Sequence, residues 1–500
     1  MGANFPSQDY RAAVSLDEPR LDFVTFAKFG ERLLLAFCFA APLSIALSQT
    51  IVVAYILHSI VCSVLYRGSL RSPAVRTISV PILSFIAIAS ISSVVGIDAP
   101  HAVPELLKTA FYLILPFSVY LTLTVSLPTR ELAESASHLL TKCLTFFTAL
   151  ILGQSIAAIH TIIDPGFGPS WSLKPPGPVT ESGQLVFVLT FLMFALYYIE
   201  QFATNAPQQA SATLTRLLSL MLFGWLLVLA WPEQFAPQTI AYHAPLYRMV
   251  TALCLVVLLG AKVYRSTSER STAKVPLLVR LSPFLPWITC ALLGAALLIN
   301  LKRGPWLGVF ISGTALGLFV ARRMLPITLI LVLLLFFLHP TYERVLHLVD
   351  DFSIVGGRQN MWTLGAELAE RFPLGLGWDN ASFMQQFDPQ LPPTHRHMHN
   401  NLLNITVECG WLGVIVYLWW MVAAIALGIR AWMILRSDGK PQVRSLGNLA
   451  FTLSVALLGW QIAGLVEYNF GDGEVRLLAL LSMGMVSAIA SLTHSTAQKV

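Results

Sequence analysis

NLLNITVECGWLGVIVYLWWMVAAIALGI, residues 401–429, is an apolar run in which Glu408 is the one charged side chain. About 20 such residues are enough for a helix that crosses the hydrocarbon core of a bilayer. Runs of this kind follow one another along most of the chain. The sequence therefore predicts an all-α polytopic membrane protein with about 12–14 transmembrane helices.

The predicted spans are separated by short polar gaps. They cover residues 32–48, 50–66, 77–96, 106–126, 138–163, 184–203, 214–231, 249–264, 283–300, 304–321, 324–339, 401–429, 446–466 and 474–493. The first two are short and almost contiguous, so they could form one span, and this is why a range is predicted.

The composition supports this class. Of the 500 residues, 56% are hydrophobic and 12% are charged, and the mean hydropathy is +0.69, which lies outside the range of soluble globular domains. The net charge of +6 does not indicate nucleic acid, because most Lys and Arg residues lie in gaps between apolar runs. The six cysteines lie in apolar segments without metal-binding spacing and are interpreted as small core residues.

The distribution of positive charge predicts the orientation. Positive residues gather in alternate gaps, which face the cytoplasm if the N-terminus does. These residues are Arg67, Arg71, Arg76, Arg130, Arg216, Lys262, Arg265, Arg270, Lys274, Arg280, Arg322, Arg323, Arg430, Arg436, Lys440 and Arg444. The expected organisation is a cytoplasmic tail (1–31, without a signal peptide), helices (32–339), a periplasmic catalytic loop (340–400), C-terminal helices (401–493) and a cytoplasmic tail (494–500).

The loop 340–400 is too long for a simple connector, and loops of this length usually carry function. Within it, residues 358–371 are predicted to form a helix with Met361, Trp362 and Leu368 on one side, ended by Phe372-Pro373. The glycines that follow, at positions 375 and 377, predict an irregular stretch that folds back over the membrane.

Cations on the outer side of the predicted topology are few, and each is a candidate anion ligand. They are Lys174, Arg248, Lys302, Arg303, Arg344, Arg358, Arg371, Arg396 and Arg476. Lys302 and Arg303 form a tight turn between two spans, and Pro305 suits the first turn of the next helix. The free amides at that helix start would join Arg303 in an anion site. The alternative is that both side chains reach out to lipid headgroups.

Three alternating histidines, His395, His397 and His399, precede the run at 401–429. Asn400 or Asn401 is a natural N-cap, so His399 is expected just ahead of a helix N-terminus. A neutral imidazole there could act as a general base. Two alternatives are polar residues at a helix entry and a metal site made of the three histidines.

Ionisable residues at membrane depth are costly and usually paired or functional, so Glu408 is expected to orient a helix or to bind an outer arginine. Phosphate-binding loops, dinucleotide fingerprints and nucleophile elbows are absent from the sequence, so ATP-driven chemistry is not indicated.

Three motifs together resemble the O-antigen ligase and polymerase superfamily. They are Arg303-Gly304-Pro305-Trp306-Leu307; Gly357-Arg358 with Trp362 and Pro373-Leu374-Gly375-Leu376-Gly377 to Phe383; and His399-Asn400 with Leu403, Glu408, Gly410 and Gly413. They cover residues from about 300 to 415, while the first 280 residues match only in hydrophobic pattern. Lys302 departs from the small residue expected before the arginine.

The resemblance implies a GT-C-like glycosyltransferase of the inner membrane. Such an enzyme moves a glycan from undecaprenyl diphosphate to an acceptor at the periplasmic face, without nucleotide, metal or other cofactor. Lipid A-core is the acceptor expected for an O-antigen ligase, the member that the sequence favours. Repeat-unit polymerase and protein O-oligosaccharyltransferase remain alternatives, of which the second is disfavoured because no C-terminal soluble domain is expected. A secondary transporter is the alternative from a different class.

The expected mechanism is an inverting displacement. His399 is the expected base, and Arg303 and Arg358 are expected to clamp the diphosphate. Further expected substrate contacts are Arg248, Lys302, Arg396, His397, Asn400, Glu408 and Trp362. The expected partners are the lipid-linked donor, the acceptor and membrane lipids, with no nucleic acid, and the sequence does not predict an oligomeric state.

Overall fold

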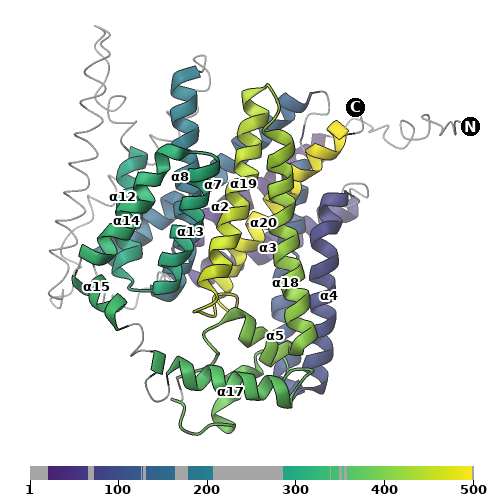
Figure 1. Cartoon of the computed structure of the whole chain (residues 1–500). Helices are drawn as coiled ribbons and strands as arrows, with labels where there is room; N and C mark the ends of the chain where they lie inside the picture. The colour runs from purple at the N-terminus through teal and green to yellow at the C-terminus, as the bar shows by residue number, and fades with distance from the viewer. Residues whose placement is uncertain are drawn as a thin grey trace, which may run out of the picture.

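A computed structural model describes residues 21–65, 72–125, 127, 131–163, 178–205, 285–337, 339–347, 352–353, 357–392 and 394–497. Within these ranges all regular structure is helical (Figure 1). The helices are α2 (Leu21–Ala40), α3 (Ile45–Leu65), α4 (Pro73–Val95), α5 (Ala99–Tyr112), α6 (Leu115–Thr124), α7 (Leu132–Ile163), α8 (Pro178–Asn205), α12 (Leu285–Ile299), α13 (Arg303–Phe319), η3 (Arg322–Met324), α14 (Leu325–Phe337), α15 (His339–Leu346), α17 (Arg358–Arg371), η4 (Asn380–Gln386), α18 (Asn401–Leu435), α19 (Pro441–Ala463) and α20 (Gly473–Ala497).

Eight stretches of these helices are long and apolar enough to cross a membrane. They are Ile45–Val64, Pro73–Val95, Ala99–Thr124, Leu132–Ile159, Thr180–Ile199, Asn401–Leu435, Pro441–Ala463 and Gly473–Thr493. The predicted all-α polytopic class is thereby confirmed. The predicted spans in the described ranges fall on helices, although the span predicted at 106–126 is divided between α5 and α6. The spans predicted at 214–231 and 249–264 lie outside the described ranges, as does Arg248.

Several helix boundaries differ from the predicted spans, and local chemistry explains two of these differences. The turn between α2 and α3 lies at residues 41–44 rather than near 49. Pro42 cannot donate a helix hydrogen bond, and Ser44 Oγ accepts from the Leu47 amide at 3.4 Å. Helix α5 begins seven residues before the predicted span because Asp98 caps it, accepting from the His101 amide at 3.1 Å.

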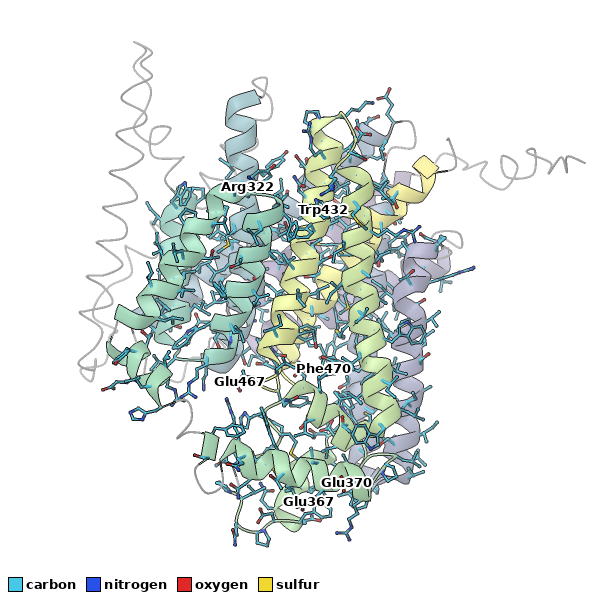
Figure 2. The ribbon with its side chains drawn as sticks, viewed as in Figure 1. Arg322, Glu367, Glu370, Trp432, Glu467 and Phe470 are labelled. Atoms are coloured by element: carbon cyan, nitrogen blue, oxygen red, sulfur yellow. The ribbon has the colours of Figure 1, made fainter. Side chains whose placement is uncertain are left out.

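The helices stand side by side in a bundle, and α17 lies across one end of it (Figure 1). We call this end the site end, and the end with Arg322 and Trp432 the opposite end (Figure 2). Helices α13 and α19 approach closely. A Cβ added to Gly308 would lie only 2.6 Å from the Gly459 carbonyl oxygen. Such backbone proximity requires small residues and fixes α13 against α19.

The long loop is folded rather than extended. Its predicted helix is confirmed with the same bounds, as α17, and Met361 and Leu368 are each 2% exposed. These two side chains belong to a small hydrophobic core, separate from that of the bundle, which also includes Leu376, Met384 and Met398. The loop therefore holds its functional side chains on a packed unit.

Helix α18 is broken at Gly410, which has φ 70° and ψ −176°, so the span predicted at 401–429 consists of two helical segments. The irregular stretch after α17 supplies the missing hydrogen bonds. The amide of Leu376 donates to the Val407 carbonyl at 2.8 Å and that of Gly377 to the Glu408 carbonyl at 3.0 Å. Backbone groups that are not paired within a helix must find such partners in a membrane.

The same stretch is joined to α4. The Ile97 amide donates to the Leu376 carbonyl at 2.9 Å, and the Trp378 amide donates to Ser93 Oγ at 3.2 Å. The loop is therefore anchored to α4 and α18 together, so this irregular stretch folds back onto the helix bundle.

Candidate active site

A carboxylate that sequence analysis did not single out lies at the centre of the site. Glu467 belongs to the segment 464–472, between α19 and α20, and lies at the site end of the bundle (Figure 2). Its Oε1 lies 2.8 Å from Arg358 Nη2, and its Oε2 lies 3.3 Å from His399 Nδ1. One side chain thus joins two residues that the sequence predicted to be catalytic.

The surroundings of Glu467 favour its charged form. Burial alone would raise the pKa of this carboxyl. The hydrogen bond with His399 and the positive charges of Arg358 and Lys302 outweigh burial, so the pKa of Glu467 lies below its usual value. Glu467 is therefore a carboxylate at neutral pH, surrounded by cations.

The entry of α18 holds the segment 464–472 in place. Asn400 is the N-cap, as predicted, and accepts from the Leu403 amide at 3.1 Å, while its Nδ2 donates to the Leu465 carbonyl at 2.9 Å. Next to it, Asn401 Oδ1 accepts from the Phe470 amide at 3.0 Å. The two asparagines fix Glu467 relative to His399.

His399 itself has a left-handed backbone, with φ 47°. This conformation is uncommon for a residue with a side chain, and it persists only where the surroundings enforce it. Two hydrogen bonds hold the preceding residue, Met398, in place. Its carbonyl accepts from Trp362 Nε1 at 2.8 Å, and its amide donates to Asn404 Oδ1 at 3.0 Å. Trp362 thus has a structural part in the site.

The other two histidines surround His399. The ring centroids of His397 and His399 are 4.2 Å apart, and those of His395 and His399 are 5.9 Å apart. Burial, together with the charge of nearby His399, lowers the pKa of His397 to about 4, so His397 is neutral at neutral pH. In the described part of the chain, no three His, Cys, Asp or Glu side chains are arranged to hold a metal ion.

The turn with Lys302 and Arg303 reaches the same place. Lys302 is the N-cap of α13, and Pro305 lies in its first turn, as predicted. A Cβ added to Gly304 would lie 3.3 Å from Glu467 Cγ, so the residue after Arg303 packs closely against the stem of the Glu467 side chain. The three motifs that the sequence separates by almost a hundred residues meet at Glu467.

The remaining predicted residues lie around this centre. Arg396 is exposed, and Glu408 is buried, with its Oε2 3.4 Å from the Tyr468 hydroxyl that donates to it. Arg476, a candidate anion ligand from sequence, is 7% exposed and donates to the Phe470 carbonyl at 3.1 Å. It supports the segment 464–472 through this bond, and its expected part as an anion ligand stays a prediction.

One signal in the sequence could have found Glu467. It is a carboxylate in a short gap between two spans, on the same predicted side as the outer arginines. Buried cations require an anionic partner, and the acidic residues of that gap are the natural candidates.

The fold and the site together define a polytopic all-α membrane protein with a cationic, histidine-containing site at one end of its bundle. Residues 288–418 match the family model described as O-Antigen ligase, and a comparison with curated proteins found no match. This match supports the O-antigen ligase superfamily and a membrane function of the ligase or polymerase type. The match includes Arg303, Arg358 and His399, whereas Glu467 lies beyond it.

Proposed function

We propose that this protein is an O-antigen ligase of the bacterial inner membrane. It would transfer a glycan from undecaprenyl diphosphate to lipid A-core at the periplasmic face. The observation that carries the proposal is the meeting of a histidine and two cationic segments at Glu467, because a diphosphate leaving group and a hydroxyl nucleophile need these two kinds of group.

His399 is the general base in this proposal. Its Nδ1 faces Glu467 Oε2 at 3.3 Å, so an Nδ1 proton donated to the carboxylate leaves Nε2 as the proton acceptor. The carboxylate then stabilises the imidazolium as the proton arrives, as in other His–carboxylate pairs. General-base catalysis of this kind contributes about 10²- to 10⁴-fold in rate.

Arg303 and Arg358 stabilise the leaving group. A guanidinium has five N–H donors, so the bond from Arg358 to Glu467 is compatible with further bonds to phosphate oxygens. The free backbone amides at the N-terminus of α13, next to Arg303, can also donate hydrogen bonds to a bound anion. Removal of one such donor typically costs about 2.7–4 kcal/mol of transition-state stabilisation.

The chemical step is a single displacement. The bond between the anomeric carbon and the phosphate oxygen breaks, and its electron pair goes to the diphosphate. The acceptor oxygen bonds to the anomeric carbon from the opposite face, and its proton passes to His399 Nε2. The anomeric configuration is therefore inverted.

The helices around the start of α13 offer apolar surface to the lipid tail of a lipid-linked donor. A small apolar hollow of about 20 Å³ lies between α12, α13 and α14, and its lining includes Leu298, Trp306 and Leu331. Trp306 is three residues from Arg303, so in this proposal the isoprenoid chain would lie over this apolar surface with its diphosphate at the start of α13.

The broken helix α18 is a feature that favours a secondary transporter, since such proteins use helix breaks to bind ions. Here, however, the carbonyls of Val407 and Glu408 at the break are bonded by the amides of Leu376 and Gly377. These bonds support a structural role for the break, and the transferase remains the favoured function.

Electrophoresis of lipopolysaccharide from cells that lack the gene tests the proposal. We expect loss of the whole long-chain ladder together with accumulation of lipid-linked polymer, and restoration of the ladder by the wild-type gene but not by His399→Ala. A core that carries a single repeat unit would instead identify a polymerase. An unchanged ladder would exclude both activities and turn attention to transfer to protein.

A further inference from the structure

A buried carboxyl outside the candidate active site contacts the segment that leads into it. Glu181 lies in the first turn of α8 and is 2% exposed. Its Oε2 accepts from Thr161 Oγ1 at 2.5 Å and from Asn300 Nδ2 at 3.1 Å. Burial of a carboxyl is costly, so this contact needs an explanation.

Asn300 connects Glu181 to the cationic turn. It lies between the end of α12 and Leu301, which has a left-handed backbone with φ 52°. Lys302 and Arg303 follow directly. A left-handed residue other than glycine is unfavourable and must be held by its surroundings, and Asn300 is the adjacent residue with a side-chain bond to a different helix.

The far side of the turn is already fixed. A Cβ added to Gly304 would lie 2.8 Å from the Ala463 carbonyl oxygen, so α13 starts in tight contact with α19. Trp306 Nε1 donates to the Leu297 carbonyl at 2.9 Å, which joins α13 to α12. The bond between Asn300 and Glu181 adds the anchor to α8.

We propose that Glu181 is a positioning residue that, through Asn300, fixes the turn carrying Lys302 and Arg303. Its purpose rests on the proposed function, in which Arg303 contacts the donor diphosphate. Precise placement of a charged group matters for catalysis, because a displacement of about 1 Å can cost about a hundredfold in rate.

Thr161 provides a matched control. It donates to the same carboxyl oxygen as Asn300. Unlike Asn300, however, it belongs to α7 and is not adjacent in sequence to the turn. If Glu181 only stabilised the packing of helices, Thr161→Val and Asn300→Ala would have equal effects. Glu181→Gln retains an oxygen that can accept from Asn300 and serves as the conservative variant.

Hydrogen–deuterium exchange of the full-length protein in detergent tests the inference independently of activity. In Glu181→Ala and Asn300→Ala, we expect the amides of residues 301–304 to exchange at least about tenfold faster, since leaving a buried hydrogen-bonding group without its partner loosens the segment by roughly that factor. Glu181→Gln and Thr161→Val are expected to exchange like wild type. Unchanged exchange in Glu181→Ala, or equal acceleration in Thr161→Val, would overturn the inference.

Glycan transfer with lipid-linked donor and acceptor completes the test. We expect Glu181→Ala to reduce transfer about tenfold in the wild-type background and to add no further loss to Arg303→Ala, because coupled residues are not additive. Wild-type transfer by Glu181→Ala would overturn the positioning role. Full activity of Arg303→Ala would contradict the proposed clamp instead, while the exchange result would still decide whether Glu181 fixes the turn.

Discussion

At the scale of single residues, the site depends on one carboxylate that serves two partners. Glu467 bonds to Arg358 through Oε1 and to His399 through Oε2. The imidazole is therefore held by its Nδ1 side, and the guanidinium by one of its nitrogens. This arrangement separates the base from the clamp, and the two roles predict different kinetic signatures.

We predict that His399→Ala retains donor binding and loses transfer by a hundredfold or more, the range of general-base catalysis. Arg303→Ala should weaken both donor affinity and transfer, and Arg303→Lys should restore them only in part, because an ammonium cannot reproduce the guanidinium fork. Binding of lipid-linked donor and single-turnover transfer measure the two effects separately. His397→Ala is the control, with a smaller expected loss, and the reverse order of the two histidines would show that the base is misassigned.

A second prediction concerns the stability that neutral His397 confers. The pKa of His397 is about 4 in the folded protein, below the value of about 6.5 for an unperturbed histidine. The unfolded chain therefore binds the proton more readily, and stability falls as pH drops from about 6.5 to about 4. Thermal unfolding in detergent at pH 7 and pH 4.5 should show a larger drop in midpoint for wild type than for His397→Gln. Equal drops would contradict the burial of a neutral imidazole.

At the scale of elements, the break in α18 unites the loop with the membrane helices. Gly410 combines a positive φ with close contact, because a Cβ there would lie 2.3 Å from the Pro373 carbonyl oxygen. The break lets the stretch after α17 pair with the carbonyls of Val407 and Glu408. An unbroken helix would have used both carbonyls itself.

Gly410→Ala is therefore expected to lower the thermal unfolding midpoint and the yield of folded protein in detergent. The backbone conformation alone costs on the order of 1–3 kcal/mol for a residue with a side chain, and the contact with Pro373 adds to this. Gly439→Ala is the matched control, since a Cβ there meets nothing within 4 Å. A Gly410→Ala protein as stable as Gly439→Ala would show that the break is not required.

At the scale of the whole molecule, the bundle has two chemically different ends. The site end carries α17 and the segment with Glu467, and the opposite end carries Arg322 and Trp432 (Figure 2). The exposed residues Gln390 and Ser437 lie in the long loop and in the turn after α18, respectively. They are suitable positions for reporters of orientation.

We predict that a reporter at Ser437 lies in the cytoplasm and one at Gln390 in the periplasm, since Lys and Arg gather in the gaps on the side of Ser437. Accessibility of single introduced cysteines to a membrane-impermeant thiol reagent in intact spheroplasts measures both positions. A cytoplasmic Gln390 would place His399 in the wrong compartment for the proposed acceptor and would contradict the proposed function.

The sequence by itself determined the fold class and the local elements. Apolar runs of spanning length predict helices because a bilayer leaves backbone groups no partner except one another. The bounds of α17, the Asn400 cap and the place of Pro305 in the first turn of α13 also followed from local rules, since caps, prolines and helix periodicity act over a few residues.

The tertiary structure decided what those rules cannot reach. Glu467 is 68 residues from His399 and 109 from Arg358, and the pairing depends on how α19 and α20 place the segment between them. The break at Gly410 likewise exists because a distant loop bonds to the freed carbonyls. Sequence patterns report which face of a helix is apolar, but close packing decides which charges meet, because a buried charge is stable only next to its partner.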